Sequence, residues 1–342
     1  MNLKELAQHL NLSQTTVSRA LNGYPEVRDA TRKRVQEAAI AFNYTPNTRA
    51  KALATGRSMS IGTVIPTSNK HEMVNPIFGD FVTGASEAYV KAGYDMVLTL
   101  IEDGEEERLY RAIRAKGNVD GIMLHSPTMD DPRVGLLKEL GLPFVVHGRA
   151  SHLPPDYSWL DMNNKRAFQR ATAFLLELGH RRIALINGLE QQDFAFRRRS
   201  GYVEALAQHG LTEDPALMTS SEMTELEGYR AAHRMLALPD PPTAFLCSSM
   251  LMAIGTRRAV ADARLDLGRD VSVITHDDDL SYLKNGQDVP IFTATRSSMR
   301  DAGRRAATML LQQIAEPGGQ PMQYMMEAEL IVGQSTGPAP RR

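Results

Sequence analysis

The chain has a single cysteine, Cys247, and no apolar run long enough to cross a membrane. One thiol cannot form a disulfide or a thiolate metal cluster within one chain. The first residues also lack a basic segment followed by an apolar stretch, which is the pattern of a secretory leader. These absences predict a cytoplasmic protein that has no association with a membrane.

The common signatures of catalysis are also missing. The sequence has no phosphate-binding P-loop, no His-Glu-x-x-His zinc motif and no nucleophile elbow. The neighbouring carboxylates Asp277 and Asp278 lack an evident general-acid partner, and contiguous residues cannot all converge on one metal ion. We therefore predict no catalytic residue, no metal site and no cofactor, and we expect the chain not to be an enzyme.

Positive charge is concentrated at the start of the chain. The first 57 residues contain nine Lys or Arg and four Asp or Glu, a net charge of +5, so the rest of the 342 residues carry −6. This length favours a small basic module followed by a larger acidic one. A compact cationic segment on an acidic protein is typical of a protein that binds a nucleic-acid backbone, and a solvated basic face is the alternative.

Apolar residues in the basic segment recur at helical spacing and predict three short helices. Asn2 and Ser13 are placed to cap the first two helices. The three apolar stripes are Leu3, Leu6, Ala7 and Leu10, then Val17, Ala20 and Leu21, then Val35, Ala38, Ala39 and Phe42. The opposite face of the second helix carries Gln14, Thr15, Ser18 and Arg19, which can all hydrogen-bond to bases or phosphates. Periodicity alone fits a recognition helix or an ordinary three-helix bundle.

The residues themselves are more specific than their periodicity. Ser-Gln-Thr-Thr-Val-Ser-Arg-Ala-Leu-Asn from Ser13 to Asn22, then Thr31-Arg32 and Asn43-Tyr44-Thr45-Pro46-Asn47, resembles the DNA-binding signature of the LacI/GalR repressor family. The resemblance implies that Gln14, Thr15 and Arg19 enter the major groove, with Arg19 placed for a bidentate contact to guanine. The full set of DNA-binding residues that it implies is Gln14, Thr15, Thr16, Ser18, Arg19, Asn22, Tyr44, Asn47, Ala50 and Leu53.

Residues 47–54 resemble the hinge helix of the same family. The resemblance implies that Leu53 wedges into the minor groove at the centre of a palindromic operator, and the alternative is a linker leucine packed on the core. We therefore expect a helix-turn-helix domain at residues 1–45, a hinge helix and linker at 46–58, and a ligand-binding and dimerisation domain at 59–342.

The larger domain alternates short apolar runs with amphipathic helices, which predicts α/β structure with parallel sheets. The predicted strands are 61–65, 96–100, 121–124, 144–147, 183–186, 244–247 and 271–275, and residues 158–162 are predicted to cross between two lobes. We expect an N-lobe of residues 59–160 plus 292–320 and a C-lobe of residues 161–291 plus 321–336. The family resemblance implies a two-lobed fold like that of periplasmic binding proteins, behind an all-α headpiece.

Ligands of such folds bind at the carboxyl ends of the strands, so a cleft between the lobes is the predicted site. Arg198 precedes Gly201-Tyr202 and matches the family's effector-binding arginine, whose guanidinium can hold two hydroxyls; a solvated basic turn is the alternative. Phe78 or Phe81 can stack on a sugar ring, although for Phe81 we favour core packing. The predicted ligand-binding residues are Asn75, Phe78, His147, Arg149, Arg198, Ser249, Asp277 and Arg296.

The resemblance implies a DNA-binding transcriptional repressor that binds double-stranded palindromic operator DNA as a homodimer and is released by a small sugar. Residues 21–27 and 275–298 resemble the α-glucoside-utilisation repressors of this family, which implies an α-glucoside effector such as trehalose, maltose or sucrose, or a phosphorylated form. Three alternatives stay open: a regulator activated by its ligand as corepressor, a secreted sugar-binding protein, and a carbohydrate-active enzyme.

Overall fold

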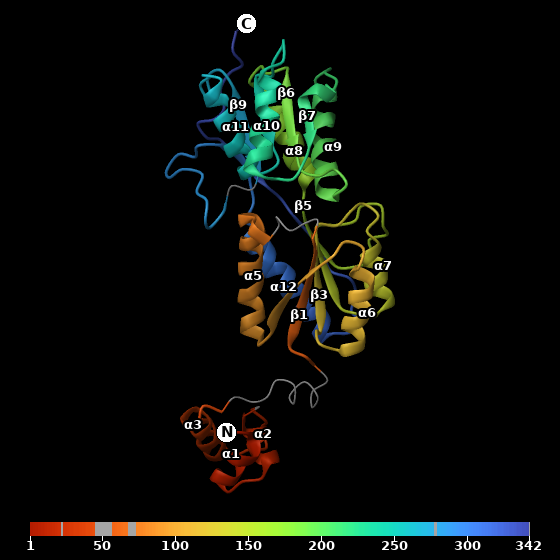
Figure 1. Ribbon diagram of the computed structural model, residues 1–342, viewed down its shortest axis with the longest axis vertical. Helices are drawn as coiled ribbons and strands as arrows, with labels where there is room; N and C mark the ends of the chain where they lie inside the picture. Colours follow the sequence, from red (N-terminus) through yellow and green to blue (C-terminus); the bar gives the residue numbers. More distant parts are fainter. Residues whose placement is uncertain (22, 45–56, 68–72, 277–278, 342) are drawn as a thin grey trace. The chain divides into compact units, whose positions relative to one another are not determined.

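The computed structural model describes residues 1–21, 23–44, 57–67, 73–276 and 279–341. They divide into two compact units (Figure 1), one of Met1–Met59 with Gly117–Val119, and one of Ser60–Lys116 with Asp120–Arg342. We call them the headpiece and the α/β unit. None of the helices in these ranges is long and apolar enough to span a membrane.

The headpiece contains helices α1 (Leu3–Leu10), α2 (Gln14–Leu21) and α3 (Asp29–Ala41) around one small core. The predicted caps are confirmed, because Asn2 accepts from the backbone N–H of Glu5 and Ser13 Oγ accepts from that of Thr16, each at 3.0 Å. Phe42 is a correction: it follows the last residue of α3 and is 37% exposed, so it is not part of the buried stripe.

The first lobe of the α/β unit is a six-stranded parallel sheet in the order β11-β5-β4-β3-β1-β2. Figure 1 shows α5 and α12 on one face and α6 and α7 on the other. The strands are β1 (Ser60–Pro66), β2 (Asp95–Ile101), β3 (Gly121–His125), β4 (Phe144–His147), β5 (Trp159–Met162) and β11 (Gln323–Met326). The helices are α5 (Pro76–Ala92), α6 (Glu106–Lys116), α7 (Pro132–Glu139) and α12 (Met299–Ala315).

The second lobe is a six-stranded sheet in the order β12-β10-β9-β8-β6-β7, parallel except for the antiparallel pair β10 and β12. Helices α8 and α9 cover one apolar layer of this sheet, and α10 and α11 cover the other. The strands are β6 (Ile183–Asn187), β7 (Met218–Ser220), β8 (Ala244–Cys247), β9 (Ser272–His276), β10 (Thr293–Arg296) and β12 (Glu329–Ile331). The helices are α8 (Asn164–Glu177), α9 (Asp193–Gln208), the 3-10 turn Pro215–Leu217, α10 (Glu225–Leu236) and α11 (Met250–Asp262).

All seven predicted strands are present, and the two-lobed fold class is confirmed. The predicted assignment of segments to the two lobes was wrong in two places. Strand β10, assigned to the N-lobe, pairs with β9 of the second sheet, and β11, assigned to the C-lobe, pairs with β5 of the first. Residues 158–162 include a full strand of the first sheet, and the chain crosses after it. The other crossings lie between β10 and α12 and between β11 and β12.

Helices α5 and α12 touch backbone to backbone. A Cβ added at Gly84 would overlap the carbonyl oxygen of Arg300, and one added at Gly303 would overlap that of Phe81. Only glycine fits at such contacts, because any larger residue would force the helices apart. The pair matters for function because both helices begin at the pocket described below.

Candidate functional site: a recognition helix and an interlobe pocket

The outer face of α2 carries the polar side chains predicted to read bases. Gln14, Thr15 and Arg19 are exposed, whereas Val17 and Ala20 on the inner face are fully buried in the headpiece core. This division orients the helix: its apolar side is fixed against α1 and α3, and its hydrogen-bonding side faces outward. Long donors and acceptors on an exposed helix face are the groups that reach base edges in a major groove.

Several polar residues of the headpiece are engaged within the protein. Thr16 Oγ1 lies 2.8 Å from Ser13 Oγ, so its hydroxyl is part of the helix cap. Arg34 donates to the carbonyl of Leu10 at 2.8 Å, and Arg32 pairs with Asp29. Ser18 is half-buried. Tyr44 packs partly buried against the headpiece core, and burial raises its pKa. Asn22, Asn47, Ala50 and Leu53 lie outside the described residues.

A pocket lies inside the α/β unit, where the carboxyl ends of strands from both sheets meet. It contains about 880 Å³ of space not filled by protein, part of it open to solvent. The lining comes from the starts of α5 and α12, from the ends of β4, β5, β9 and β11, and from α8, α9 and the segments after β3 and β8. The site therefore uses residues of both lobes.

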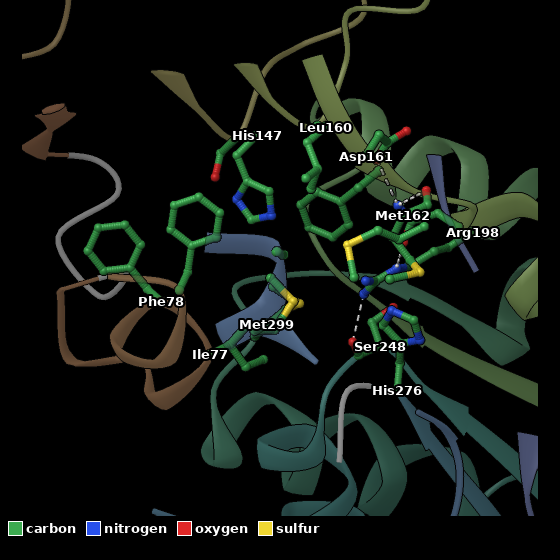
Figure 2. Close-up of a pocket in the computed structure, with 18 of the residues that line it drawn as sticks. Ile77, Phe78, His147, Leu160, Asp161, Met162, Arg198, Ser248, His276 and Met299 are labelled. Atoms are coloured by element: carbon green, nitrogen blue, oxygen red, sulfur yellow. Dashed lines mark hydrogen bonds between the residues drawn. The ribbon is translucent and has the colours of Figure 1, made fainter. Parts of the chain in front are cut away.

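Arg198 of α9 is the cationic group of the pocket. It is only 5% exposed, donates from Nε to Asn164 Oδ1 at 2.8 Å and from Nη1 to the carbonyl of Ser248 at 2.7 Å (Figure 2). Its guanidinium lies over the rings of Phe194 and Phe168, at 4.7 and 5.2 Å from their centroids. These contacts fix the planar group in one orientation, which is the condition for recognising paired hydroxyls.

His147 lines the first-lobe side of the pocket and contacts a second histidine, His125, behind it. The Nδ1 atoms of His125 and His147 lie 3.3 Å apart, and the ring of Phe81 stacks on His147 with centroids 4.1 Å apart. Burial lowers the pKa of His147 to about 4, and burial, His147 and Arg133 lower that of His125 well below its usual value. Both rings are therefore neutral near pH 7, and one donates its Nδ1–H to the other.

A set of charges, which we call the interlobe ion cluster, joins the lobes beside the pocket, and all of its members except the partly exposed Arg149 are buried. Arg149 and Asp161 belong to the first lobe, and Asp193 and Arg197 to α9 of the second. Asp161 Oδ2 lies 2.9 Å from Arg149 Nε and 3.1 Å from Arg197 Nη2, and Arg197 Nε lies 2.5 Å from Asp193 Oδ2. Burial raises the pKa of Asp161 to about 7 and also raises that of Asp193, against the lowering effect of Arg149. Asp161 also lines the pocket, so the cluster and the pocket share a residue.

Four of the predicted ligand-binding residues line this one pocket: Asn75, Phe78, His147 and Arg198. Three others are not in its lining. Arg149 pairs with Asp161 and lies 5.1 Å from the Trp159 ring centroid, and Ser249 is fully buried as the cap of α11. Arg296 ends β10 and is half-buried. Asp277 lies outside the described residues.

The sequence prediction missed five polar residues of the lining: Ser126, Asp161, Asn164, Ser248 and His276. Ser248 lines the pocket where Ser249 was expected. Phe81, predicted as core, is 1% exposed and also lines the pocket. Four methionines are also part of the lining: Met162, Met223, Met299 and Met326. The strand pattern around Asp161 was the available signal, because a polar residue that ends a parallel strand lies at the ligand-binding edge.

Comparison with known proteins agrees with both units. Residues 2–47 match the family model described as "Bacterial regulatory proteins, lacI family", and residues 172–336 match the "Periplasmic binding protein-like domain". The chain is 48% identical over 343 residues to the HTH-type transcriptional regulator AglR of Rhizobium meliloti (strain 1021), with 100% of this chain and 96% of that relative covered.

Two solved structures are also similar. The "transcriptional regulator CelR-cellobiose complex" is 29% identical with a TM-score of 0.72, covering 97% of this chain and 99% of that one. The lac repressor dimer bound to operator and the anti-inducer ONPF has a TM-score of 0.83 at 22% identity, covering 98% of this chain and 99% of that one, and shows the likeness of fold alone.

These relatives are named transcriptional regulators, which agrees with the prediction that the chain is not an enzyme. The headpiece with the exposed polar face of α2, the two-lobed unit with its interlobe pocket and the full-length match to AglR lead to one conclusion. The chain belongs to the lacI family of bacterial regulatory proteins.

Proposed function

We propose that the protein is a repressor that binds a palindromic operator as a homodimer and is released from it by an α-glucoside. The observation that carries the proposal is the combination of the outward polar face of α2 with a pocket built around the buried guanidinium of Arg198. The similar CelR was solved with cellobiose, a glucoside of two rings, which supports a glucoside for this pocket.

The experiment uses the full chain and a duplex selected from a random-sequence DNA library. Fluorescence anisotropy should show preferred binding to a palindromic duplex over a scrambled one, and weaker binding after an α-glucoside is added. A stronger complex with the glucoside would reverse the sign of control and indicate a corepressor. Equal binding to both duplexes would overturn the proposal.

Arg19 provides the first test of base reading. The Arg19→Ala variant should bind the selected operator at least about fivefold more weakly, since a bidentate base contact contributes roughly 1–3 kcal/mol. Binding to the scrambled duplex should change much less. Lys33→Ala is the matched control, because it removes the same charge from an exposed position on α3, outside the α2 face. Equal losses on both duplexes for Arg19→Ala would assign Arg19 to phosphate contact.

Strand β2 supports the homodimer. It is the edge strand of the first sheet, and Val97, Leu98 and Leu100 on it are 40%, 38% and 57% exposed. An edge strand presents unpaired backbone groups, and an exposed apolar edge is a typical protein interface. A second copy of the chain is the partner that fits, because two headpieces are needed for the two half-sites of a palindrome.

A charge on this edge should therefore separate the copies. Leu98→Glu is expected to shift the protein from dimer to monomer in analytical ultracentrifugation, because a buried unpaired carboxylate is costly. Operator affinity should fall with it. Val332→Glu, at a 56% exposed position of the second lobe, controls for an added surface charge. A Leu98→Glu protein that sediments as a dimer would rule out β2 as the interface.

The interlobe ion cluster supports a route from ligand to DNA. Asp161 faces the ligand pocket and also contacts Arg197 of the opposite lobe. A ligand that contacts Asp161 and Arg198 together favours one arrangement of the two lobes over others, which is what an effector must do to shift an equilibrium. We assign the arrangement of the lobes that these contacts hold to the ligand-bound protein.

A further inference from the structure

We infer that Asp193 and Arg197, which do not line the pocket, set its affinity for the ligand by holding the two lobes in the arrangement described above. The two residues lie one turn apart at the start of α9 in the second lobe. Their contacts with Pro127, Ser151 and Asp161 of the first lobe are called the interlobe latch below. The inference rests on the proposed function for its ligand, because the pocket is the one assigned there to an α-glucoside.

Asp193 binds two separate segments of the first lobe. Its backbone N–H donates to the carbonyl of Pro127, in the segment after β3, at 2.9 Å. Its Oδ1 accepts from the backbone N–H of Ser151, in the segment after β4, at 3.0 Å, and also from the Ser151 hydroxyl. Asp193 is fully buried, and a buried carboxylate needs such donors to replace water. These donors surround Asp193 only while the lobes are in contact.

Arg197 adds a contact with a third part of the first lobe. Its Nη2 lies 3.1 Å from Asp161 Oδ2, and its Nε forms the ion pair with Asp193. Asp161 Oδ1 in turn accepts from Asn164 Nδ2 at 3.4 Å, and Asn164 Oδ1 accepts from Arg198. Asp161 and Arg198 lie on the same side of the pocket in Figure 2. A continuous chain of polar contacts therefore connects the latch to the cation of the pocket.

The segments that the latch holds together are also walls of the pocket. Pro127 lines the pocket, and so does Gly148, three residues before Ser151. On the other lobe, Phe194 directly follows Asp193 and lines the pocket as well. Separation of Asp193 from Pro127 and Ser151 would therefore move first-lobe walls away from a second-lobe wall.

The latch bears on the arrangement of the lobes more than on their folding. Each lobe has its own sheet, so the two can separate while both stay folded, and the charges of Asp161, Asp193 and Arg197 would then contact water. Removal of one charge leaves its partner buried without compensation in the joined arrangement alone. A ligand that contacts both lobes needs the joined arrangement, so its apparent dissociation constant rises as the population of that arrangement falls.

Arg199 provides the matched control for Arg197. It lies two residues further along α9 and also pairs with two carboxylates, Glu190 and Glu213, but both belong to the second lobe. The Arg199→Gln variant therefore loses the same charge and the same kind of ion pairs without losing a contact between the lobes.

The first test is hydrogen–deuterium exchange of the full chain without ligand. The backbone N–H groups of Ser151 and Asp193 are the reporters, because each is hydrogen-bonded across the lobes and exchanges when they separate. In Arg197→Gln, peptides with these residues should exchange at least about fivefold faster than in the parent chain, and in Arg199→Gln at the parental rate. Peptides of β8 and β9 should be unchanged in both variants, which separates lobe opening from unfolding.

The second test measures affinity by isothermal titration calorimetry. The probe is whichever of maltose, trehalose and sucrose binds the parent chain most tightly. Arg197→Gln should bind this sugar at least about fivefold more weakly, and Arg199→Gln should bind it like the parent. Saturating sugar should return the exchange of Ser151 and Asp193 in Arg197→Gln to the parental rate, because the ligand then holds the lobes. A merely damaged fold would not recover in this way.

Ser151→Asp tests the latch without a change in the protein core. Ser151 is exposed, and the new carboxylate would face that of Asp193 in the joined arrangement, where like charges repel. This variant should show faster exchange at Asp193 and weaker sugar binding. Thr308→Asp, at an exposed position of α12, controls for the added charge and should show neither effect. Ser151→Asp decides the question if Arg197→Gln melts well below the parent.

Parental exchange at Asp193 in both Arg197→Gln and Ser151→Asp would overturn the inference. Faster exchange with an unchanged affinity for the sugar would also overturn it, because the contacts would then hold the lobes without controlling the ligand. No heat from any of the three sugars, in a parent chain that still binds its operator, would overturn the α-glucoside effector instead. The exchange experiment uses no sugar, so the two failures are distinguishable.

Discussion

The Arg198→Ala variant is expected to bind an α-glucoside at least roughly 30-fold more weakly than the parent chain, because removing one partner of a buried charged contact costs about 2–5 kcal/mol. Arg198 is nearly fully buried, and its hydrogen bonds to Asn164 and Ser248 and the rings of Phe168 and Phe194 hold it in the pocket. Operator binding should persist, since the headpiece is untouched, but the glucoside should no longer release it.

Arg199→Ala is the matched control for this prediction. Arg199 is the next residue of α9, but it is 41% exposed, pairs with Glu190 and Glu213, and is absent from the pocket lining. Its loss should leave the glucoside titration unchanged. The Arg198→Lys variant separates the effect of charge from that of shape, because lysine keeps the positive charge and lacks the planar guanidinium. This variant should still bind the glucoside weakly. Normal glucoside affinity in Arg198→Ala, with parental thermal stability, would remove Arg198 from the site.

Acid should destabilise the α/β unit through three histidines whose pKa values are lowered. The pKa of His147 in the folded protein is about 4, and those of His125 and His276 are also lowered by burial. Below the unfolded pKa of about 6.5, these histidines are protonated in the unfolded chain but neutral in the folded chain. The stability present near pH 7 is therefore lost as the pH falls. Each pH unit in this window costs about 1.4 kcal/mol per histidine, so His147 alone accounts for roughly 2 kcal/mol at pH 5.

Urea unfolding at pH 7 and pH 5 measures this effect. Trp159, the only tryptophan of the chain, is buried in β5 and reports on the α/β unit. Asp161 acts in the opposite direction, because its pKa is raised to about 7 and folding is favoured by its protonation as the pH falls below that value. His147→Gln isolates one histidine and should reduce the loss between pH 7 and pH 5 by about 2 kcal/mol. His233→Gln, an exposed histidine on α10, should not reduce it.

The periodicity of apolar residues was sufficient to predict the three headpiece helices and the seven strands named from the sequence. Leu6, Leu10, Val17 and Val35 are buried as their spacing predicted, because a small core admits only one stripe from each helix. The prediction that Phe42 belongs to the buried stripe failed because α3 ends one residue before it. The placement of β10 and β11 could not be read from the sequence. A strand of four residues carries too little pattern to say which of two sheets it joins, and the pairing of Gln323 with Trp159 depends on tertiary contacts.

The residues of the pocket could likewise be predicted only in part. Arg198 was predicted because its neighbours resemble a family motif, and the structure brings it into one pocket with Asn75, Phe78 and His147. The methionines were invisible as pocket residues, since a methionine at helical or strand spacing is indistinguishable from core in the sequence. Arg149 was misplaced because its partner, Asp161, lies twelve residues away and becomes a neighbour only when β4 and β5 pair.

The direct backbone contact between α5 and α12 has a mechanical consequence. Because their backbones touch at Gly84 and Gly303, the two helices cannot tilt or slide against each other without a collision, and we expect them to move as a single rigid block. Whatever presses on Phe78 or Met299 at one end of this block displaces all of it. Because α5 also packs against β2, the same displacement is delivered to the exposed sheet edge without a relay of rotamer changes.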